Sequence, residues 1–400
     1  MTNSLGRSLA LLLLVALPVW AQIDPVKRQL IQIGYNAPFQ GHAPFAGYAF
    51  YYHNQPNFLQ ESNLTLRVAL APVYLDSELG IHQVLGEYTD LGIGIAGGGF
   101  ADSYVEFHQG KYIQAESFLG HVAEGTLSLY HLINPAQRIP LNLLVRGSVH
   151  HSFYEDDDNT SSAFELPSDM TSFNIRTGLR WGGSEPVLFP ALAMELSTWY
   201  ATSIRMNPGT YGFNNDRSVE PMSHLFWAHA MLNYTFPEWE HSFRVNLVTG
   251  TSINADRFSA YRLGAYLPLA SEFPLNLPGY YYQELSAQGF VLMGGSYLMP
   301  LEKKKRWNLF AQASGAYVDY LPGLEQPGHW HSGVGGGVLF RSDAIKFLVT
   351  YGYGVNAMRS DGRGAHNVGF LLQFDLERAN TVLNPMNLYR WSGWLRLFGS

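Results

Sequence analysis

The 400-residue sequence has no cysteine and few charged residues, and both shortages narrow the class of protein. A chain without cysteine is neither a lipoprotein nor a secreted domain stapled by disulfides. Charged residues make up 14% of the chain, against roughly 25% in ordinary soluble domains, so a charged surface is lacking. The net charge of −7 gives no sign of a nucleic-acid partner, because nucleic acids bind basic surfaces.

Long apolar runs are also missing beyond the first residues, although 14% of the chain is aromatic and 40 residues are glycine. A transmembrane helix needs about 20 apolar residues in a row. If the chain crosses a membrane, it therefore does so with strands.

The N-terminus has the pattern of a secretion signal. Arg7 precedes an apolar run from Leu9 to Leu17, and Ala21 ends a short segment suited to signal peptidase. The run is too short to span a bilayer as a helix. We predict a cleaved signal peptide over 1–21 and a mature chain that starts at Gln22.

Apolar and polar residues alternate along segments of about ten residues, as in strands between lipid and a polar lumen. In 139–153, for example, Val145 and Val149 share a face opposite Arg146. An arginine inside such a strand is costly unless its face is wet, so we predict that these charges line the lumen. The predicted lumenal charges are Arg146, Arg176, Arg180, Glu195 and Arg244.

Short connections between these segments alternate with long polar ones, as periplasmic turns alternate with external loops in bacterial barrels. The sequence predicts an all-β fold, a transmembrane antiparallel β-barrel of about 16 strands over 22–376 in the bacterial outer membrane. The predicted strands are 28–36, 45–54, 64–74, 87–100, 103–113, 119–133, 139–153, 170–182, 190–201, 222–235, 241–252, 288–300, 306–318, 330–341, 345–356 and 365–376.

The last predicted strand has the pattern found at the end of bacterial outer-membrane barrels, and only Leu371 breaks its alternation. We expect the barrel assembly machinery to read this strand during biogenesis. The residues of the pattern are Asn367, Gly369, Leu372 and Phe374. The tail 377–400 mixes aromatic and basic residues, which fits either an amphipathic segment at the periplasmic membrane surface or a plug in the barrel mouth.

The longest loop, 253–288, contains Gly264 at its base and the stretch Leu277-Pro278-Gly279-Tyr280, and a glycine-rich strand over 333–342 follows it. This region resembles the bacterial surface antigen family, the outer-membrane assembly and translocation barrels of the BamA and TamA type. The resemblance covers about 250–376. It implies a loop folded into the lumen and a weak lateral seam between the first and last strands, with few hydrogen bonds between 28–36 and 365–376.

Two departures from the family pattern concern the ion pair that holds its loop in the barrel. Pro278 stands where the family has arginine, and Ala313 stands where the resemblance places the acidic partner. We therefore expect this pair to be lost as a unit. Predicted strands begin soon after residue 22, so we also expect a barrel without the family's periplasmic POTRA domains.

Other candidate chemistry has weaker support. Gly92, Gly94 and Gly97 match a dinucleotide fingerprint by letters, but they lie in a strand pattern with no helix after it. His150 and His151 precede an acidic run over 155–158, which favours a solvated patch over a metal site, since adjacent strand residues point to opposite faces. We expect no enzyme activity, no cofactor and no metal.

Two functions remain open at this point. One is a barrel that aids insertion or translocation of proteins through the lumenal loop and the seam, with other outer-membrane proteins as clients. The other is a passive or selective channel whose lumenal charges set selectivity. Outer-membrane lipid and lipopolysaccharide are expected partners of either, and nucleic acid is not.

Overall fold

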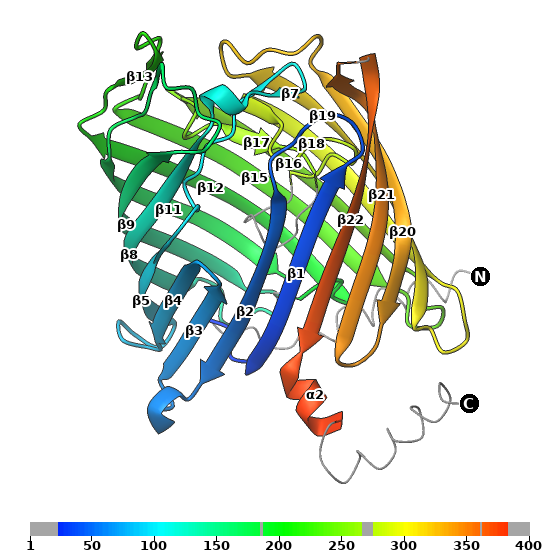
Figure 1. Ribbon diagram of the computed structural model, residues 1–400. Coiled ribbons are helices and arrows are strands. Elements are labelled where there is room, and N and C mark those ends of the chain that lie inside the picture. The colour runs from blue at the N-terminus through cyan, green and yellow to red at the C-terminus, as the bar shows by residue number, and fades with distance from the viewer. Residues whose placement is uncertain (1–22, 185–186, 266–274, 361, 383–400) are drawn as a thin grey trace, which may run out of the picture.

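The structure, a computed structural model, describes residues 23–184, 187–265, 275–360 and 362–382. In that part of the chain, antiparallel strands close into a barrel with sixteen strands in its wall, which confirms the predicted fold (Figure 1). The predicted signal peptide 1–21 and most of the tail 377–400 lie outside the described residues. None of the described helices is long and apolar enough to span a membrane.

The wall strands are β1 (Arg28–Pro38), β2 (Ala46–Pro56), β3 (Leu64–Ala71), β4 (Tyr74–Ile81), β5 (Thr89–Gly98), β8 (Phe118–Leu132), β9 (Leu141–Asp156), β11 (Met170–Gly183), β12 (Leu192–Met206), β15 (Met222–Thr235), β16 (Ser242–Ile253), β18 (Leu285–Pro300), β19 (Trp307–Tyr320), β20 (Trp330–Arg341), β21 (Ile345–Arg359) and β22 (Gly362–Asp375). The loops add β6 (Phe107–His108), β7 (Lys111–Tyr112), β10 (Phe164–Glu165), β13 (Thr210–Phe213), β14 (Arg217–Ser218), β17 (Tyr261–Leu263) and two short 3-10 helices, η1 (Phe58–Gln60) and η2 (Gln114–Glu116). A helix, α2 (Leu376–Val382), follows the last strand.

The outer face of the wall is apolar, because alternate residues of each strand point away from the lumen. Large apolar side chains on this face are more than one third exposed, as expected where lipid replaces water. They include Ile95, Leu127, Val149, Ile175, Leu247, Met293 and Val349. A closed barrel with such a belt resides in the bacterial outer membrane.

The two ends of the barrel differ in the length of their connections. Segments 99–117, 157–169, 207–221 and 254–284 lie at one end, and the opposite end carries shorter turns together with α2 (Figure 1). Long loops mark the extracellular end of bacterial barrels and short turns the periplasmic end.

The N-terminal third of the wall differs from the sequence prediction in two places. The predicted strand 103–113 is wrong, because this segment belongs to an extracellular loop and forms only the two-residue strands β6 and β7. The predicted strand 64–74 joined β3 to the start of β4, which a tight turn at Pro72 and Val73 separates. One error added a strand and the other removed one, so the total remained sixteen.

The seam between β1 and β22 is fully paired, which contradicts the expected shortage of hydrogen bonds there. The two strands stay in register from Leu30↔Asp375 to Pro38↔Asn367. That ladder has as many residue pairs as the one between β1 and β2. Inside the barrel, Gln32 donates to Gln373 at 2.9 Å, and both side chains are buried.

The connection between β11 and β12 folds into the periplasmic mouth of the barrel. Leu188 is 4% exposed and packs against a lumenal cluster that includes Leu371, and its backbone N–H donates to Gln373 Oε1 at 2.8 Å. The other buried members of this cluster are Leu298, Phe310, Leu339 and Leu348. Leu371 breaks the alternation of the last strand because its lumenal position is dry.

Replacing Phe374 with Asp is expected to prevent insertion of the barrel. Phe374 lies on the outer face of β22, between Ile31 of β1 and Ile345 of β21, so a carboxylate there faces lipid at the seam. The amount of heat-modifiable barrel in outer-membrane fractions measures the effect, with Phe374→Leu as the control. Wild-type levels of folded Phe374→Asp protein would show that this residue does not carry the signal.

Candidate functional site

The loop 254–284 enters the barrel from its extracellular end. Its strand β17 pairs with the start of β18, and Tyr261 Oη donates to the backbone carbonyl of Phe226 in the wall at 2.9 Å. The chain then bends at Gly264, where a Cβ atom would lie 2.1 Å from the carbonyl oxygen of Tyr281. Only glycine fits at this bend, so the predicted role of Gly264 at the loop base has a steric reason.

The tip of the loop is a tight turn over Leu277, Pro278, Gly279 and Tyr280. The Tyr280 N–H donates to the Leu277 carbonyl at 3.3 Å, and Gly279 has φ +86°. Proline in the second position and glycine with positive φ in the third are the pattern of a type II turn. Leu277 and Tyr280 are fully buried, so the structure places the tip within the packed interior.

Glycines in the last strands form the bed on which this tip lies. A Cβ at Gly333 would be 2.2 Å from the Pro278 carbonyl oxygen, and a Cβ at Gly279 would be 1.8 Å from the backbone nitrogen of Gly354. The glycine-rich stretch of β20 therefore makes room for the backbone of the loop.

A buried ion pair holds the base of the tip. Glu284 and Arg359 form two parallel contacts, Nη1 to Oε1 at 2.9 Å and Nη2 to Oε2 at 3.1 Å. Their side chains are 0% and 3% exposed. Arg359 also donates to the Gly279 carbonyl at 3.3 Å and lies 3.6 Å from the ring centroid of Tyr281. This arrangement fixes both the loop and the extracellular end of β21.

The sequence reasoning missed this pair. It expected the family's ion pair to be lost at Pro278 and Ala313, whereas here the acid lies on the loop and the cation on the barrel wall. Ala313 is exposed on the outer face of β19 and cannot reach the loop. The two residues beside Ala313 do contact the loop. The Asn276 side chain donates to Gln312 Oε1 at 3.1 Å, and the Asn276 carbonyl accepts from Ser314 Oγ at 2.7 Å.

Asn367 connects the loop tip to the seam. Its Oδ1 accepts the Gly279 N–H at 3.2 Å, and its Nδ2 donates at 3.2 Å to Oδ1 of Asn36 on β1. Both asparagines are buried. The predicted assembly-signal residue Asn367 thus lies on the lumenal face of β22 with Gly369, while Leu372 and Phe374 lie on the lipid face.

A second loop covers the first from outside. In the segment 99–117, the Val105 carbonyl accepts from Arg262 at 2.5 Å, and the ring of Phe107 stacks on Tyr281 with centroids 5.6 Å apart. Together the two loops pack against the extracellular ends of β18 and β21.

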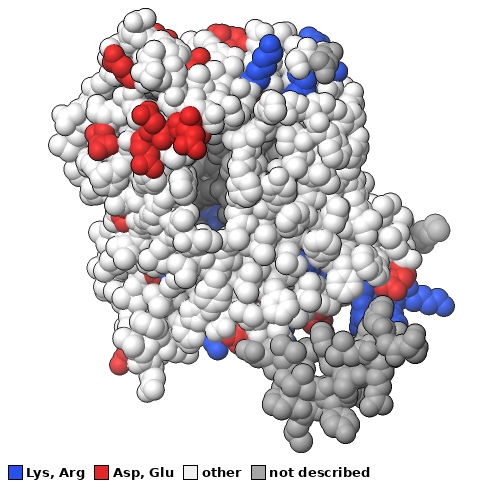
Figure 2. Space-filling view, viewed as in Figure 1, with Lys and Arg blue, Asp and Glu red and all other residues white. Residues whose placement is uncertain are grey.

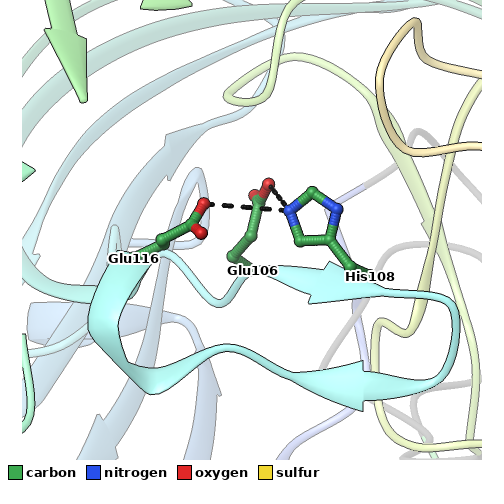
Figure 3. A group of neighbouring side chains, drawn as sticks. All are labelled: Glu106, His108 and Glu116. Atoms are coloured by element: carbon green, nitrogen blue, oxygen red, sulfur yellow. Dashed lines mark ion pairs between the residues drawn. The ribbon is translucent and has the colours of Figure 1, made fainter. Parts of the chain in front are cut away.

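Glu106, His108 and Glu116 in this covering loop are close enough together to hold a divalent ion (Figure 3). Both carboxylates already have cationic partners: Arg257 lies 3.2 Å from Glu106, and Arg217 pairs with Glu116. A metal ion would have to displace these arginines, so we interpret the group as an ion-pair cluster. Burial raises the pKa of Glu106, but the hydrogen bond from His108 and the charges of the two arginines outweigh it and lower the pKa to about 2.

Acid is expected to release the covering loop. The pKa of Glu106 falls from about 4.5 unfolded to about 2 folded, so its contribution of about 3 kcal/mol is complete above pH about 4.5 and disappears as pH drops toward 2. Cleavage of 99–117 by pepsin, measured relative to an unfolded reference peptide at each pH, should rise as the pH falls through this window. The same ratio should stay constant for Glu106→Gln, and an unchanged wild-type ratio down to pH 2 would contradict the assignment.

The five predicted lumenal charges lie on the inner wall. Arg146 pairs with Glu78 at 3.0 Å, and Glu195 lies 3.4 Å from His229. Arg176 stacks over Trp199 and Trp227, 4.4 and 4.9 Å from the two ring centroids. Arg180 and Arg244 share the inner face with the others.

His150 and His151 point to opposite faces of β9. His150 lies 2.7 Å from both Glu124 and Asp102, and His151 lies 2.8 Å from the Thr171 hydroxyl. The two rings therefore contact separate sets of partners.

No family model and no curated protein matches the sequence. Solved structures do match. CdiB from Escherichia coli has a TM-score of 0.57 at 11% identity, over 88% of this chain and 63% of that one. BamA from Haemophilus ducreyi lacking POTRA domains 1–3 has a TM-score of 0.54 at 10% identity, over 88% and 70%. CdiB from Acinetobacter baumannii has 0.53 at 11%, over 87% and 60%.

This chain spans about three fifths of the length of the two CdiB structures. At such low identity the likeness concerns the fold. The chain therefore has the outer-membrane barrel fold of BamA and CdiB.

Proposed function

We propose that this barrel is a surface-antigen-type protein that aids the insertion or translocation of other proteins at the outer membrane. The observation that carries the proposal is the path of hydrogen bonds from the loop tip through Asn367 to Asn36. It couples the position of a lumenal loop to the closure of the seam.

The coupling supplies a mechanism. When the tip leaves its bed, Asn367 loses the Gly279 N–H, and the extracellular half of the β1–β22 ladder is left with fewer supports. A client strand then pairs with a freed strand edge, so that new backbone hydrogen bonds replace those of the seam. Outer-membrane proteins are the clients of this mechanism. A passive channel has less support, because the loop tip with Leu277 and Tyr280 is buried inside the barrel.

The folding rate of a model outer-membrane barrel tests the function. Liposomes containing this protein should accelerate folding several-fold over empty liposomes and over liposomes containing an unrelated porin. The chain has no cysteine, so Ile33→Cys with Leu372→Cys places two thiols directly opposite each other across the seam.

Oxidising that pair should abolish the acceleration, and reduction should restore it. The matched control joins Ile33→Cys to Ala49→Cys across the β1–β2 ladder and should stay active when oxidised. An active protein with a locked seam would rule out the seam mechanism, and no acceleration over either control would rule out the function.

A further inference from the structure

The barrel wall has a notch on its extracellular side, above the hairpin of β3 and β4. These two strands have 8 residues each, whereas β8 and β9 have 15 and 16. Eight residues extend about 27 Å, or about 20 Å along the membrane normal at a typical tilt, against an apolar band about 25 Å tall. The turn at Pro72 and Val73 therefore lies at the depth of the outer leaflet.

The short hairpin leaves one edge of β2 open. β2 pairs with β1 from Ala46 to Asn54, but its ladder with β3 begins only at Tyr51. Alternate residues of a strand point their backbone groups to opposite edges, and within the described part of the chain no strand pairs with Gly47 and Ala49 on the β3 side, which we call the β2 open edge. Backbone groups without partners are strongly disfavoured at lipid depth, so this edge requires a hydrogen-bonding partner that acyl chains cannot supply.

The far side of the notch is better covered. β5 ends at Gly98, opposite Val122 of β8. Above this level the loop continues the sheet: the Asp102 N–H donates to the Gly120 carbonyl at 3.1 Å, and Tyr104 bridges to Phe118. Among the described residues, only the positions of β3 and β4 have no strand or loop at this height. With strands about 4.8 Å apart, the gap from β2 to this loop is about 14 Å, which is the room that two strands need.

The space-filling view shows a hollow in the surface at this place, with acidic side chains gathered on one side of it (Figure 2). The end of β9 and the loop after it supply Glu155, Asp156 and Asp158, all exposed, and Glu155 also lies 2.9 Å from His121. The notch is closed below by the turn at Pro72 and Val73, so an occupant enters from outside the cell.

We propose that the notch binds a β-hairpin loop of a second protein by strand addition to the β2 open edge. The hairpin has a tight turn that rests above Val73, alternating apolar residues in its strands and basic residues near its base on the side of the acidic residues. Gly47 and Ala49 are the lipid-facing residues of this edge, and the exposed ring of Phe45 lies over Gly47. The site is separate from the seam, and its occupation does not depend on insertion activity.

A synthetic hairpin tests the site on the full-length protein in phosphatidylcholine vesicles. The probe has an Asn-Gly turn, alternating Val and Thr, lysines at both ends and one cysteine in the strand meant to pair with β2. A probe with one proline in each strand is the matched control, because proline cannot complete the ladder.

Ala49→Cys should form a disulfide with the probe several-fold faster than His53→Cys, which lies on the same face of β2 where both neighbours are present. Hydrogen exchange of the Gly47 and Ala49 amides should slow at least tenfold with the probe and stay fast with the proline control.

Lengthening β3 and β4 with an alternating insert at Pro72 and Val73 should abolish both effects while the barrel stays folded. Equal rates for the two cysteines, equal effects of the two probes, or unchanged exchange of the Gly47 and Ala49 amides would each overturn the proposal and assign the edge to water or lipid headgroups.

Discussion

Arg359→Ala is expected to release the loop 254–284 from the lumen and to destabilise the protein by about 3–5 kcal/mol. The arginine is 3% exposed and its partner Glu284 is 0% exposed, so the truncation leaves a buried carboxylate without its cation. The same change removes the hydrogen bond to the Gly279 carbonyl and the stacking on Tyr281. The loop thus loses its hold on β21 at several points at once.

Conductance in planar bilayers and protease cleavage within 254–284 measure the release. Wild-type protein should conduct weakly and resist cleavage, whereas Arg359→Ala should show frequent open events and rapid cutting. Arg363→Ala, which removes an exposed arginine from the adjacent strand, is the matched control and should behave as wild type.

The double variant Glu284→Gln with Arg359→Met should recover much of the lost stability, because it leaves no unpaired charge. If Arg359→Ala conducts and resists protease like the wild type, then the pair does not hold the loop.

The sequence predicted the wall because a strand between lipid and lumen repeats every two residues. In β9, the apolar residues on either side of Arg146, such as Val145, alternate with it along the strand. This alternation was enough to assign the lipid-facing and lumenal faces of β9. The same local rule failed at 103–113, where Phe107, His108, Lys111 and Tyr112 do form strands, but ones too short to cross a membrane. Alternation reports extended backbone and gives no measure of where that backbone lies.

The ion pair of the site could not be predicted from the sequence, for a different reason. Glu284 and Arg359 are 75 residues apart, and their contact depends on how far the loop descends. The one available signal was an acidic residue among the apolar and aromatic side chains of 280–285, a setting in which a carboxylate needs a partner. Arg359 lies beyond the predicted end of its strand at 356, so nothing local marked it as part of the wall.

Leu371 shows how an irregularity in a pattern carries structural information. In the sequence, a single apolar residue on the lumenal face of the last strand is an unexplained exception to the alternation. In the fold, this residue packs against Leu188 from the periplasmic turn. The seam was mispredicted because the weakness was inferred from the family resemblance, while the residues of β1 and β22 pair throughout.

Gly279→Val is expected to lift the loop tip from its bed without preventing the barrel from folding. A Cβ atom at this position would lie 1.8 Å from the backbone nitrogen of Gly354, which belongs to the wall ladder and cannot move aside cheaply. Overpacking of this kind costs about 1–3 kcal/mol, and a valine at φ +86° adds backbone strain. The wall strands pair with one another without the tip, so heat-modifiable migration on gels should be retained.

Gly328→Val separates the collision from the backbone strain. Gly328 has φ +91°, close to that of Gly279, but a Cβ there meets nothing within 4 Å. Both variants carry the strain of a branched residue with positive φ, and only Gly279→Val drives a side chain into the wall. Loop cleavage and conductance should therefore rise in Gly279→Val alone. Equal behaviour of the two variants would mean that the tip tolerates a side chain at position 279. The proposed coupling would then fail, because the hydrogen bonds from Asn367 to the tip go to the Gly279 N–H and the Tyr280 carbonyl, at the position of the substitution.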